Sequence, residues 1–213
     1  MDIALTPTQE MLRSSARDFL EKECPPSLVR AAEKDPRGYP PELWERVAAL
    51  GWPGLLVPAG YGGSGATLLE AALLIEEAGR AALPGPLLPV LFSTLLLREA
   101  GDASVQERLL PPLAKGELVV CPALAGPESE PVRAGPHGTG HKLWGTKLFV
   151  PYADTADCLI VSADSPHGEG LFLIYLPDDG LDFTPLSTTA RDHQFEVKLE
   201  GVDAEPLSEG MAL

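Results

Sequence analysis

Apolar positions recur every three or four residues in the first half of the chain, whereas the second half carries short runs of β-branched and aromatic residues. The change falls near residue 116. The first spacing is typical of helices that bury one face, and the second is typical of strands. The pattern therefore predicts an α+β protein, with a helical domain over residues 1–116 and an antiparallel β-domain over residues 117–213.

Capping signals mark several ends of the expected helices. Thr6 and Gln9 can form a capping box for the first helix. The last helix should end by Pro111 and Pro112, because proline has no amide hydrogen to donate to the helical ladder. Five helices are expected, over Pro7–Glu23, Pro41–Leu50, Leu68–Ala82, Leu88–Ala100 and from Ser104 to Pro111.

Glycine, proline and aspartate interrupt the second half about every eight to twelve residues, as in an antiparallel β-domain. Residues 126–140 contain few apolar side chains among several prolines and glycines, so this segment is expected to be a long exposed loop. Six strands are expected, over Leu118–Ala123, Lys142–Val150, Cys158–Ala163, Gly170–Leu176, Leu181–Pro185 and Gln194–Glu200.

The composition is that of a folded and strongly acidic protein. Of the 213 residues, 45% are hydrophobic and 22% are charged, which excludes a disordered or fibrous chain. The 31 acidic residues outnumber the 16 lysines and arginines and give a net charge of −15. Such a charge repels phosphate backbones and anionic membranes, so no nucleic-acid partner is expected.

The cysteines and the longest apolar run favour a cytoplasmic protein. Cys24, Cys121 and Cys158 are odd in number and widely spaced, so neither a disulfide framework nor a metal knuckle is expected. The apolar run from Leu87 to Leu97 is about half of the ~20 residues that a membrane span needs, which favours a buried helix and no membrane span. The N-terminal residues show no secretory signal.

The sequence carries no strong signature of a metal site or of a nucleophilic hydrolase. His137, His141, His167 and His193 all fall in expected loops. The glycines around the first two argue against the helix that would place a metal-binding pair on one face, so no metal site is predicted. No Gly-x-Ser-x-Gly elbow follows a strand, which leaves a serine nucleophile without support.

The glycine-rich stretch from Gly60 to Gly65 allows two interpretations. Its amides could hold a phosphate, as glycine-rich loops do at helix N-termini. However, it joins two expected helices and has neither the Walker A nor the dinucleotide spacing. A tight turn with positive φ angles is therefore favoured.

Four motifs occur in order along the chain. Residues 50–63 are Leu-Gly-Trp-Pro-Gly-Leu-Leu-Val-Pro-Ala-Gly-Tyr-Gly-Gly, and residues 110–117 are Leu-Pro-Pro-Leu-Ala-Lys-Gly-Glu. Residues 143–147 are Leu-Trp-Gly-Thr-Lys, and Ala-Asp-Thr-Ala-Asp at 153–157 precedes Ile160 and Val161. Together these motifs resemble the acyl-CoA dehydrogenase family.

The resemblance implies the first two domains of that family, a helical domain and an antiparallel β-barrel-like domain, without the third. In the family, a C-terminal four-helix domain completes the flavin site, builds the oligomer and supplies the glutamate that removes the α-proton of the acyl-CoA. No catalytic residue is therefore expected in this chain. A homo- or hetero-oligomer with a chain that supplies the missing domain is implied. The glutamates near the end of the chain are expected to be surface groups (Glu196, Glu200, Glu205 and Glu209).

The resemblance also implies FAD as the cofactor and assigns two loops to it. Ala125 replaces a family threonine and offers a backbone amide without a hydroxyl. Pro151 replaces a threonine or serine and has neither a hydroxyl nor an amide hydrogen. FAD is therefore expected to bind with fewer polar anchors. The residues implied to bind the cofactor are Leu124, Ala125, Gly126, Ser129, Phe149, Val150 and Pro151.

Two functions follow from the resemblance. The first is FAD-dependent α,β-dehydrogenation of an acyl-CoA thioester, as in fatty acid metabolism, with the catalytic base supplied by a missing C-terminal domain or a partner subunit. The alternative is a non-catalytic subunit or binding scaffold of the same family, whose altered loops have lost the flavin. Residues 206–213 resemble the family's approach to its first C-terminal helix.

Overall fold

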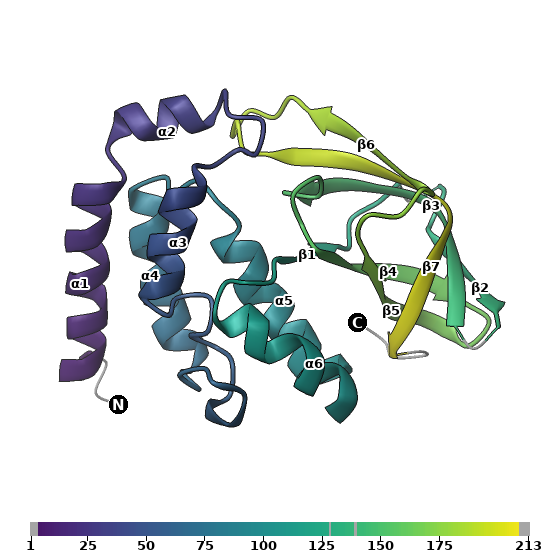
Figure 1. Ribbon diagram of the computed structural model, residues 1–213, viewed down its shortest axis with the longest axis horizontal. Helices are drawn as coiled ribbons and strands as arrows, with labels where there is room; N and C mark the ends of the chain where they lie inside the picture. Colours follow the sequence, from purple (N-terminus) through teal and green to yellow (C-terminus); the bar gives the residue numbers. More distant parts are fainter. Residues whose placement is uncertain (1–3, 128, 139, 209–213) are drawn as a thin grey trace.

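The computed structural model describes residues 4–127, 129–138 and 140–208, which form a group of helices followed by a β-barrel (Figure 1). The helices lie on one side of the molecule and the barrel lies on the other. This arrangement confirms the predicted α+β fold class. The described helices are α1 (Pro7–Glu23), α2 (Pro26–Ala32), α3 (Pro41–Ala49), the 3-10 helix η1 (Ala59–Tyr61), α4 (Leu68–Arg80), α5 (Leu87–Ala100) and α6 (Ala103–Ala114).

Helix α1 begins where the capping box predicts. The Thr6 hydroxyl accepts a hydrogen bond from the Gln9 amide, and the Gln9 side chain accepts one from the Thr6 amide. Ala16 and Leu20 are buried at helical spacing, and α1 packs against α4. Burial of this stripe, rather than intrinsic propensity, supplies most of the stability of such a helix.

The short helix α2 is not among the helices predicted from the sequence. It has seven residues and follows Pro25, and Ala32 is its buried residue. A helix of one or two turns with a single buried residue is too short to show helical spacing of apolar residues in the sequence. Its C-terminal neighbour Glu33 pairs with Arg191 of the barrel at 3.1 Å, so α2 bridges towards the second half of the chain.

Helix α6 continues through both of its prolines, so the predicted end at Pro111 and Pro112 is wrong. It also begins earlier than predicted, because Asp102 caps it by accepting a hydrogen bond from the Val105 amide at 2.8 Å. Two prolines remove two helical hydrogen bonds. Burial of the leucines around them offsets this loss (Leu109, Leu110 and Leu113).

The described strands close into a barrel. The pairs β2–β3, β3–β7, β7–β5 and β5–β4 are antiparallel, and β6 adds to β7 in the same sense. β4 runs parallel to both β1 and β2, which completes the ring. The strands are β1 (Val120–Ala123), β2 (Arg133–His137), β3 (Gly140–Pro151), β4 (Cys158–Ser165), β5 (Gly168–Tyr175), β6 (Leu181–Leu186) and β7 (Gln194–Ser208).

The segment 126–140 is not one long exposed loop, because β2 occupies part of it. Val132 and Ala134 are 1% and 5% exposed, while Arg133 between them is exposed. Two small apolar residues at alternate positions do not stand out among prolines and glycines. This segment is a strand because it pairs with β3, and the local sequence does not predict that pairing.

Strand β7 runs beyond its predicted end at Glu200 to Ser208. Gly201 has φ 75°, a value that costs glycine little, and the register with β3 shifts close by, between Leu143 and Trp144. Before this point β7 also pairs with β6, up to Leu199; after it β7 stays paired with β3 as far as Ala204 and pairs with β5 from Glu205. The bend at Gly201 therefore helps a single strand to join two parts of the barrel wall.

Two core clusters hold the structure together. One joins α5 and α6 to the barrel, and the other joins α1, α3, α4 and α5. Cys24, Cys121 and Cys158 are all buried and free. None of the described helices is long and apolar enough to cross a membrane.

Candidate functional site

Two segments that are far apart in sequence meet on the barrel surface. The amide of Leu148 donates a hydrogen bond to the carbonyl oxygen of Ala125 at 2.9 Å. Gly126 lies so close to β3 that a Cβ atom there would be 2.9 Å from the carbonyl oxygen of Thr146. We call the residues that the family resemblance assigns to the cofactor, which belong to these two segments, the loop site. Its members are Leu124, Ala125, Gly126, Ser129, Phe149, Val150 and Pro151.

Phe149 presents its ring to solvent at the loop site. It is 57% exposed, an unusual degree for a phenylalanine in a strand. The register between β3 and β7 shifts between Lys147 and Val150, and Phe149 has φ 57°. A bulge of this kind re-aims a side chain. It leaves the Phe149 ring on the outer surface, and the preceding residue, Leu148, bonds to the Ala125 loop.

The two residues after Phe149 offer little to a ligand. The Val150 side chain is fully buried in the barrel, so only its backbone could contact a ligand. Pro151 is half-buried and lies opposite Gln194 of β7. It has no amide hydrogen and no polar side chain, so its only polar atom is the carbonyl oxygen.

The Ala125 loop offers a backbone donor. Ala125 and Ser129 are exposed, and Leu124 is half-buried. No described residue accepts a hydrogen bond from the Ala125 amide. An exposed amide beside an exposed aromatic ring is an arrangement that can hold a flat, hydrogen-bonding ligand.

Lys147 lies beneath the loop site, and the sequence motifs give no role to it. Its side chain is 5% exposed, and its Nζ donates to the Leu124 carbonyl at 3.0 Å and to the Ser162 hydroxyl at 2.8 Å. Burial lowers the pKa of Lys147 to about 8, although Glu169 and Asp164 oppose this shift. A lysine at an inward-facing position of an alternating strand is the signal that could have identified it.

The glycine-rich stretch from Gly60 to Gly65 forms a turn, and its amides are already bonded. The amides of Gly63, Ser64 and Gly65 donate to carbonyl oxygens of Pro58, Gly54 and Val57 at 2.8–3.3 Å. Gly62 and Gly65 have φ values of 85° and 61°. These amides are not available to a phosphate, so the turn interpretation holds.

The prediction that all four histidines lie in loops is wrong for two of them. His137 and His141 lie in β2 and β3 rather than in loops, because these strands form a hairpin that the sequence does not predict. His193 precedes β7, and its Nε2 lies 2.9 Å from an oxygen of Asp154. Among the described residues, no group of three or more histidine, cysteine or acidic side chains could hold a metal ion.

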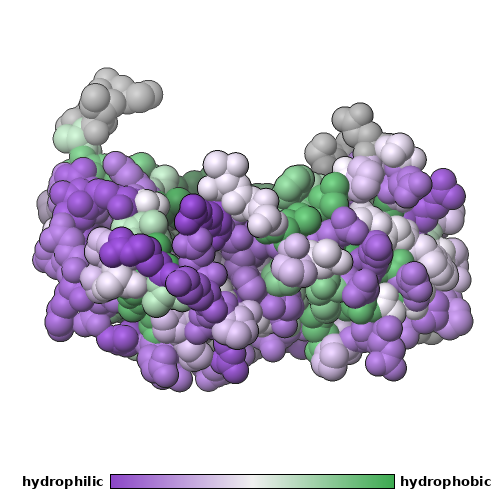
Figure 2. Space-filling model, turned by 90° about the horizontal axis from the view of Figure 1, so that it is seen from above, coloured by the Kyte–Doolittle hydropathy of each residue, from purple (hydrophilic) through white to green (hydrophobic). Residues whose placement is uncertain are grey.

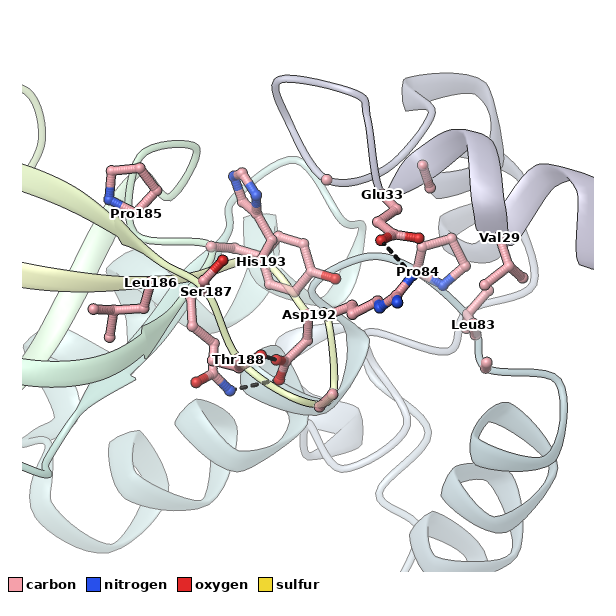
Figure 3. A pocket seen from close by; sticks show the side chains of 17 residues that line it. Val29, Glu33, Leu83, Pro84, Pro185, Leu186, Ser187, Thr188, Asp192 and His193 are labelled. Atoms are coloured by element: carbon pink, nitrogen blue, oxygen red, sulfur yellow. Dashed lines mark hydrogen bonds and ion pairs between the residues drawn. The ribbon is translucent and has the colours of Figure 1, made fainter.

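A cleft of about 570 Å³ separates α2 from the loop between β6 and β7 (Figure 3). The polar groups around it bond to one another. Arg191 pairs with Glu33 across the cleft, and Asp192 accepts hydrogen bonds from Thr188 and Gln194. These contacts join the helices to the barrel and leave this cleft a weaker candidate than the loop site.

The glutamates near the end of the chain are not arranged as a base at the loop site. Glu205 accepts hydrogen bonds from Arg108 at 2.6 Å and from the Tyr175 hydroxyl at 3.1 Å. Glu196 is half-buried on β7, and Glu200 is exposed. Glu209 lies outside the described residues.

Comparisons with known proteins identify the family. Residues 6–117 match the family model described as the acyl-CoA dehydrogenase N-terminal domain. Acyl-CoA dehydrogenase FadE27 of Mycobacterium tuberculosis is 27% identical over 207 residues, which are 96% of this chain and 56% of that protein. The chain thus spans about half the length of this relative.

Similar solved structures support the same family assignment. A variant of the Tcur3481-Tcur3483 steroid ACAD is 33% identical with a TM-score of 0.86, covering 93% of this chain and 56% of that one. The ChsE4-ChsE5 complex from Mycobacterium tuberculosis is 26% identical with a TM-score of 0.91, covering 98% and 59%. Because the family model alone covers more than half of the sequence, this chain belongs to the acyl-CoA dehydrogenase family.

Proposed function

We propose that this chain forms the helical and barrel part of a flavoprotein that carries out FAD-dependent α,β-dehydrogenation of an acyl-CoA thioester. The loop site is the proposed flavin side of that enzyme. One observation carries the proposal: the bond from the Leu148 amide to the Ala125 carbonyl joins the segment of Phe149, whose ring is exposed, to the segment of Ala125, whose amide bonds to no described residue. Acyl-CoA is the proposed substrate because the chain belongs to the acyl-CoA dehydrogenase family and its relative FadE27 carries that name.

The residues of the loop site fit a flavin ring. An isoalloxazine needs an apolar face to pack against and hydrogen-bond donors at its polar edge. Phe149 supplies an aromatic face, and the Ala125 amide supplies a donor. When bound, FAD accepts the hydride of the dehydrogenation. In this proposal Phe149 excludes water from one side of the ring, Ala125 orients it, and Pro151 contributes no donor.

The proposed catalytic base comes from outside the described residues. Glu205 is engaged with Arg108 and Tyr175, and no glutamate of β7 is a member of the loop site. Helix α5 keeps an exposed apolar stripe, where Leu88 and Phe92 are 56% and 42% exposed. Exposed apolar side chains one helical turn apart suit a further helical domain or a partner subunit. In the view from above, hydrophobic surface is also exposed on the barrel half of the molecule (Figure 2).

The second candidate function is a non-catalytic subunit of a hetero-oligomer. It is favoured by Pro151, which offers no donor, and by the absence of a hydroxyl at Ala125. Two of the similar structures carry the names of two proteins each, the ChsE4-ChsE5 complex and the Tcur3481-Tcur3483 steroid ACAD. In this alternative the chain keeps the fold and contributes an interface instead of a cofactor.

An absorbance titration separates the two functions. The purified protein is incubated with FAD, freed of excess cofactor and then mixed anaerobically with an acyl-CoA. Retention of the flavin band in the wild type, and its loss in Phe149→Ala but not in Trp144→Ala, is the result expected for the proposed flavin site. Trp144 is the matched control, because it is an exposed aromatic residue of the same strand, 47% exposed. Failure of the wild type to retain FAD would favour the non-catalytic subunit.

Bleaching of a retained band by the acyl-CoA tests the chemistry. It is expected only in an assembly that includes the chain or domain supplying the base. A retained band that does not bleach in the complete assembly would contradict the proposed dehydrogenation while leaving cofactor binding intact.

A further inference from the structure

A buried ammonium group holds the inner end of the loop site. Lys147 points from β3 into the barrel, and its Nζ donates to the Leu124 carbonyl at 3.0 Å. The Ser162 hydroxyl of β4 accepts from the same Nζ at 2.8 Å and donates to the same carbonyl at 3.1 Å. The Leu124 carbonyl oxygen thus has two donors inside the barrel wall.

Burial of this charge is unfavourable and calls for a specific role. The neighbouring inward-facing residues of β3, Leu143 and Val150, are fully buried apolar side chains. An apolar residue at position 147 would avoid the cost of removing an ammonium group from water. Hydrogen bonds to the Leu124 carbonyl and to Ser162 are what the lysine supplies instead.

The geometry of the peptide bond connects Lys147 to the outer surface. The carbonyl of Leu124 and the amide of Ala125 belong to one planar peptide group. In a trans peptide the C=O and N–H bonds point in opposite directions. Because Lys147 holds the carbonyl oxygen inside the barrel wall, the Ala125 amide must point outward, to the side on which Phe149 is exposed.

We infer that Lys147 is a positioning residue of the loop site, which fixes the Leu124–Ala125 peptide so that the Ala125 amide faces a ligand packed against Phe149. It does not touch the ligand itself. The inference rests on the proposed function for the identity of that ligand, FAD. The orientation of the Leu124–Ala125 peptide is a property of the protein without ligand, so the role of Lys147 and the identity of the ligand can be tested separately.

The first measurement is amide hydrogen exchange of the ligand-free protein. The probe is the Leu148 amide, which donates to the Ala125 carbonyl. In Lys147→Met its exchange should accelerate by about tenfold or more, the factor expected when a hydrogen bond to a charged group is lost. Lys142→Met is the control, because Lys142 belongs to the same strand and bonds to the Gly201 carbonyl at 2.7 Å. This control should leave the exchange of Leu148 unchanged.

The second measurement is FAD affinity. Lys147→Met should weaken FAD binding by about tenfold or more, and Lys147→Arg, which keeps a charged donor, should recover most of it. Equal exchange of Leu148 and equal FAD affinity in Lys147→Met and Lys142→Met would overturn the inference. If the wild type does not bind FAD, the proposed function fails while the exchange test still decides the role of Lys147.

A milder variant guards against a failure of Lys147→Met to fold. Ser162→Ala removes one of the two donors to the Leu124 carbonyl and keeps the ammonium group. In Ser162→Ala the exchange rate of the Leu148 amide should rise by about threefold, to a value between the rates of the wild type and Lys147→Met. Exchange at the wild-type rate in Ser162→Ala, with Lys147→Met unfolded, would count against the inference.

Discussion

Glu77 of α4 should make the attachment of α1 sensitive to acid. Its side chain is 1% exposed and accepts hydrogen bonds from Arg17 of α1 at 2.5 and 3.0 Å and from Arg80 at 3.0 Å. The Arg17 hydrogen bond is the main reason why the pKa of Glu77 falls from 4.5 to about 2, and Arg80 adds to it against the effect of burial. Because the folded pKa is the lower one, the stabilisation is present above pH 4.5 and is lost as the pH falls towards 2.

The magnitude follows from this shift. Lowering a carboxyl pKa from 4.5 to about 2 corresponds to about 3 kcal/mol of unfolding free energy. Arg17 and Arg80 are 46% and 48% exposed, so solvent screening reduces this to about 2 kcal/mol. Glu77→Gln should therefore lower the unfolding free energy at pH 7 by about 2 kcal/mol, or the melting temperature by about 4 to 8 °C.

The assay is urea unfolding of wild type and Glu77→Gln at pH 7 and at pH 3. The gap between the two proteins should narrow at the lower pH, as wild-type Glu77 becomes protonated on unfolding. Glu76→Gln is the matched control, because Glu76 is an exposed neighbour on the same helix whose loss removes the same charge. A gap that stays constant between pH 7 and pH 3, or one equal to that of Glu76→Gln, would refute the reasoning.

Three further predictions concern single positions. Gly63→Ala should destabilise the fold by about 2 kcal/mol or more, because its Cβ would collide with backbone carbonyl oxygens, whereas Gly60→Ala, with open space at its Cβ, should be nearly neutral in thermal melts. Tyr152→Phe should cost about 1 kcal/mol in urea unfolding, because its hydroxyl accepts a hydrogen bond from the Gly85 amide at 2.8 Å; an unchanged midpoint would contradict this. The pKa of Lys147 is lowered from 10.5 to about 8, so the unfolding free energy of the wild type, relative to that of Lys147→Met, should rise by up to about 3 kcal/mol between pH 8 and pH 10.5. If the difference in unfolding free energy does not change with pH in this range, the pKa of Lys147 is not lowered.

Much of the helical half could be predicted from the sequence because its signals are local. The capping box of Thr6 and Gln9 and the glycine after α3 act within a few residues of the chain. Helices α1, α3, α4 and α5 accordingly begin within one residue of their predicted positions. The prediction fails at α6, where burial against the barrel outweighs two prolines.

The loop site is a mixed case. The family motifs direct attention to Ala125 and Phe149, and the structure brings their segments together through the bond between Ala125 and Leu148. The assignment of these residues to a flavin remains a prediction. The alternation of β3 can mark Lys147 as inward-facing, but only the structure shows that its Nζ bonds to the Leu124 carbonyl and that the bulge at Phe149 turns the Val150 side chain into the barrel.

The sequence by itself determined the α+β class, the place where helices give way to strands, and the family to which the chain belongs. These follow from periodicity, capping and short motifs, all of which are written in consecutive residues. Only the tertiary structure decided that β2 is a strand, that β1 runs parallel to β4, and that the Leu124 carbonyl is held by Lys147. Each of these depends on groups distant in sequence that become neighbours when the barrel closes, and no local preference encodes that closure.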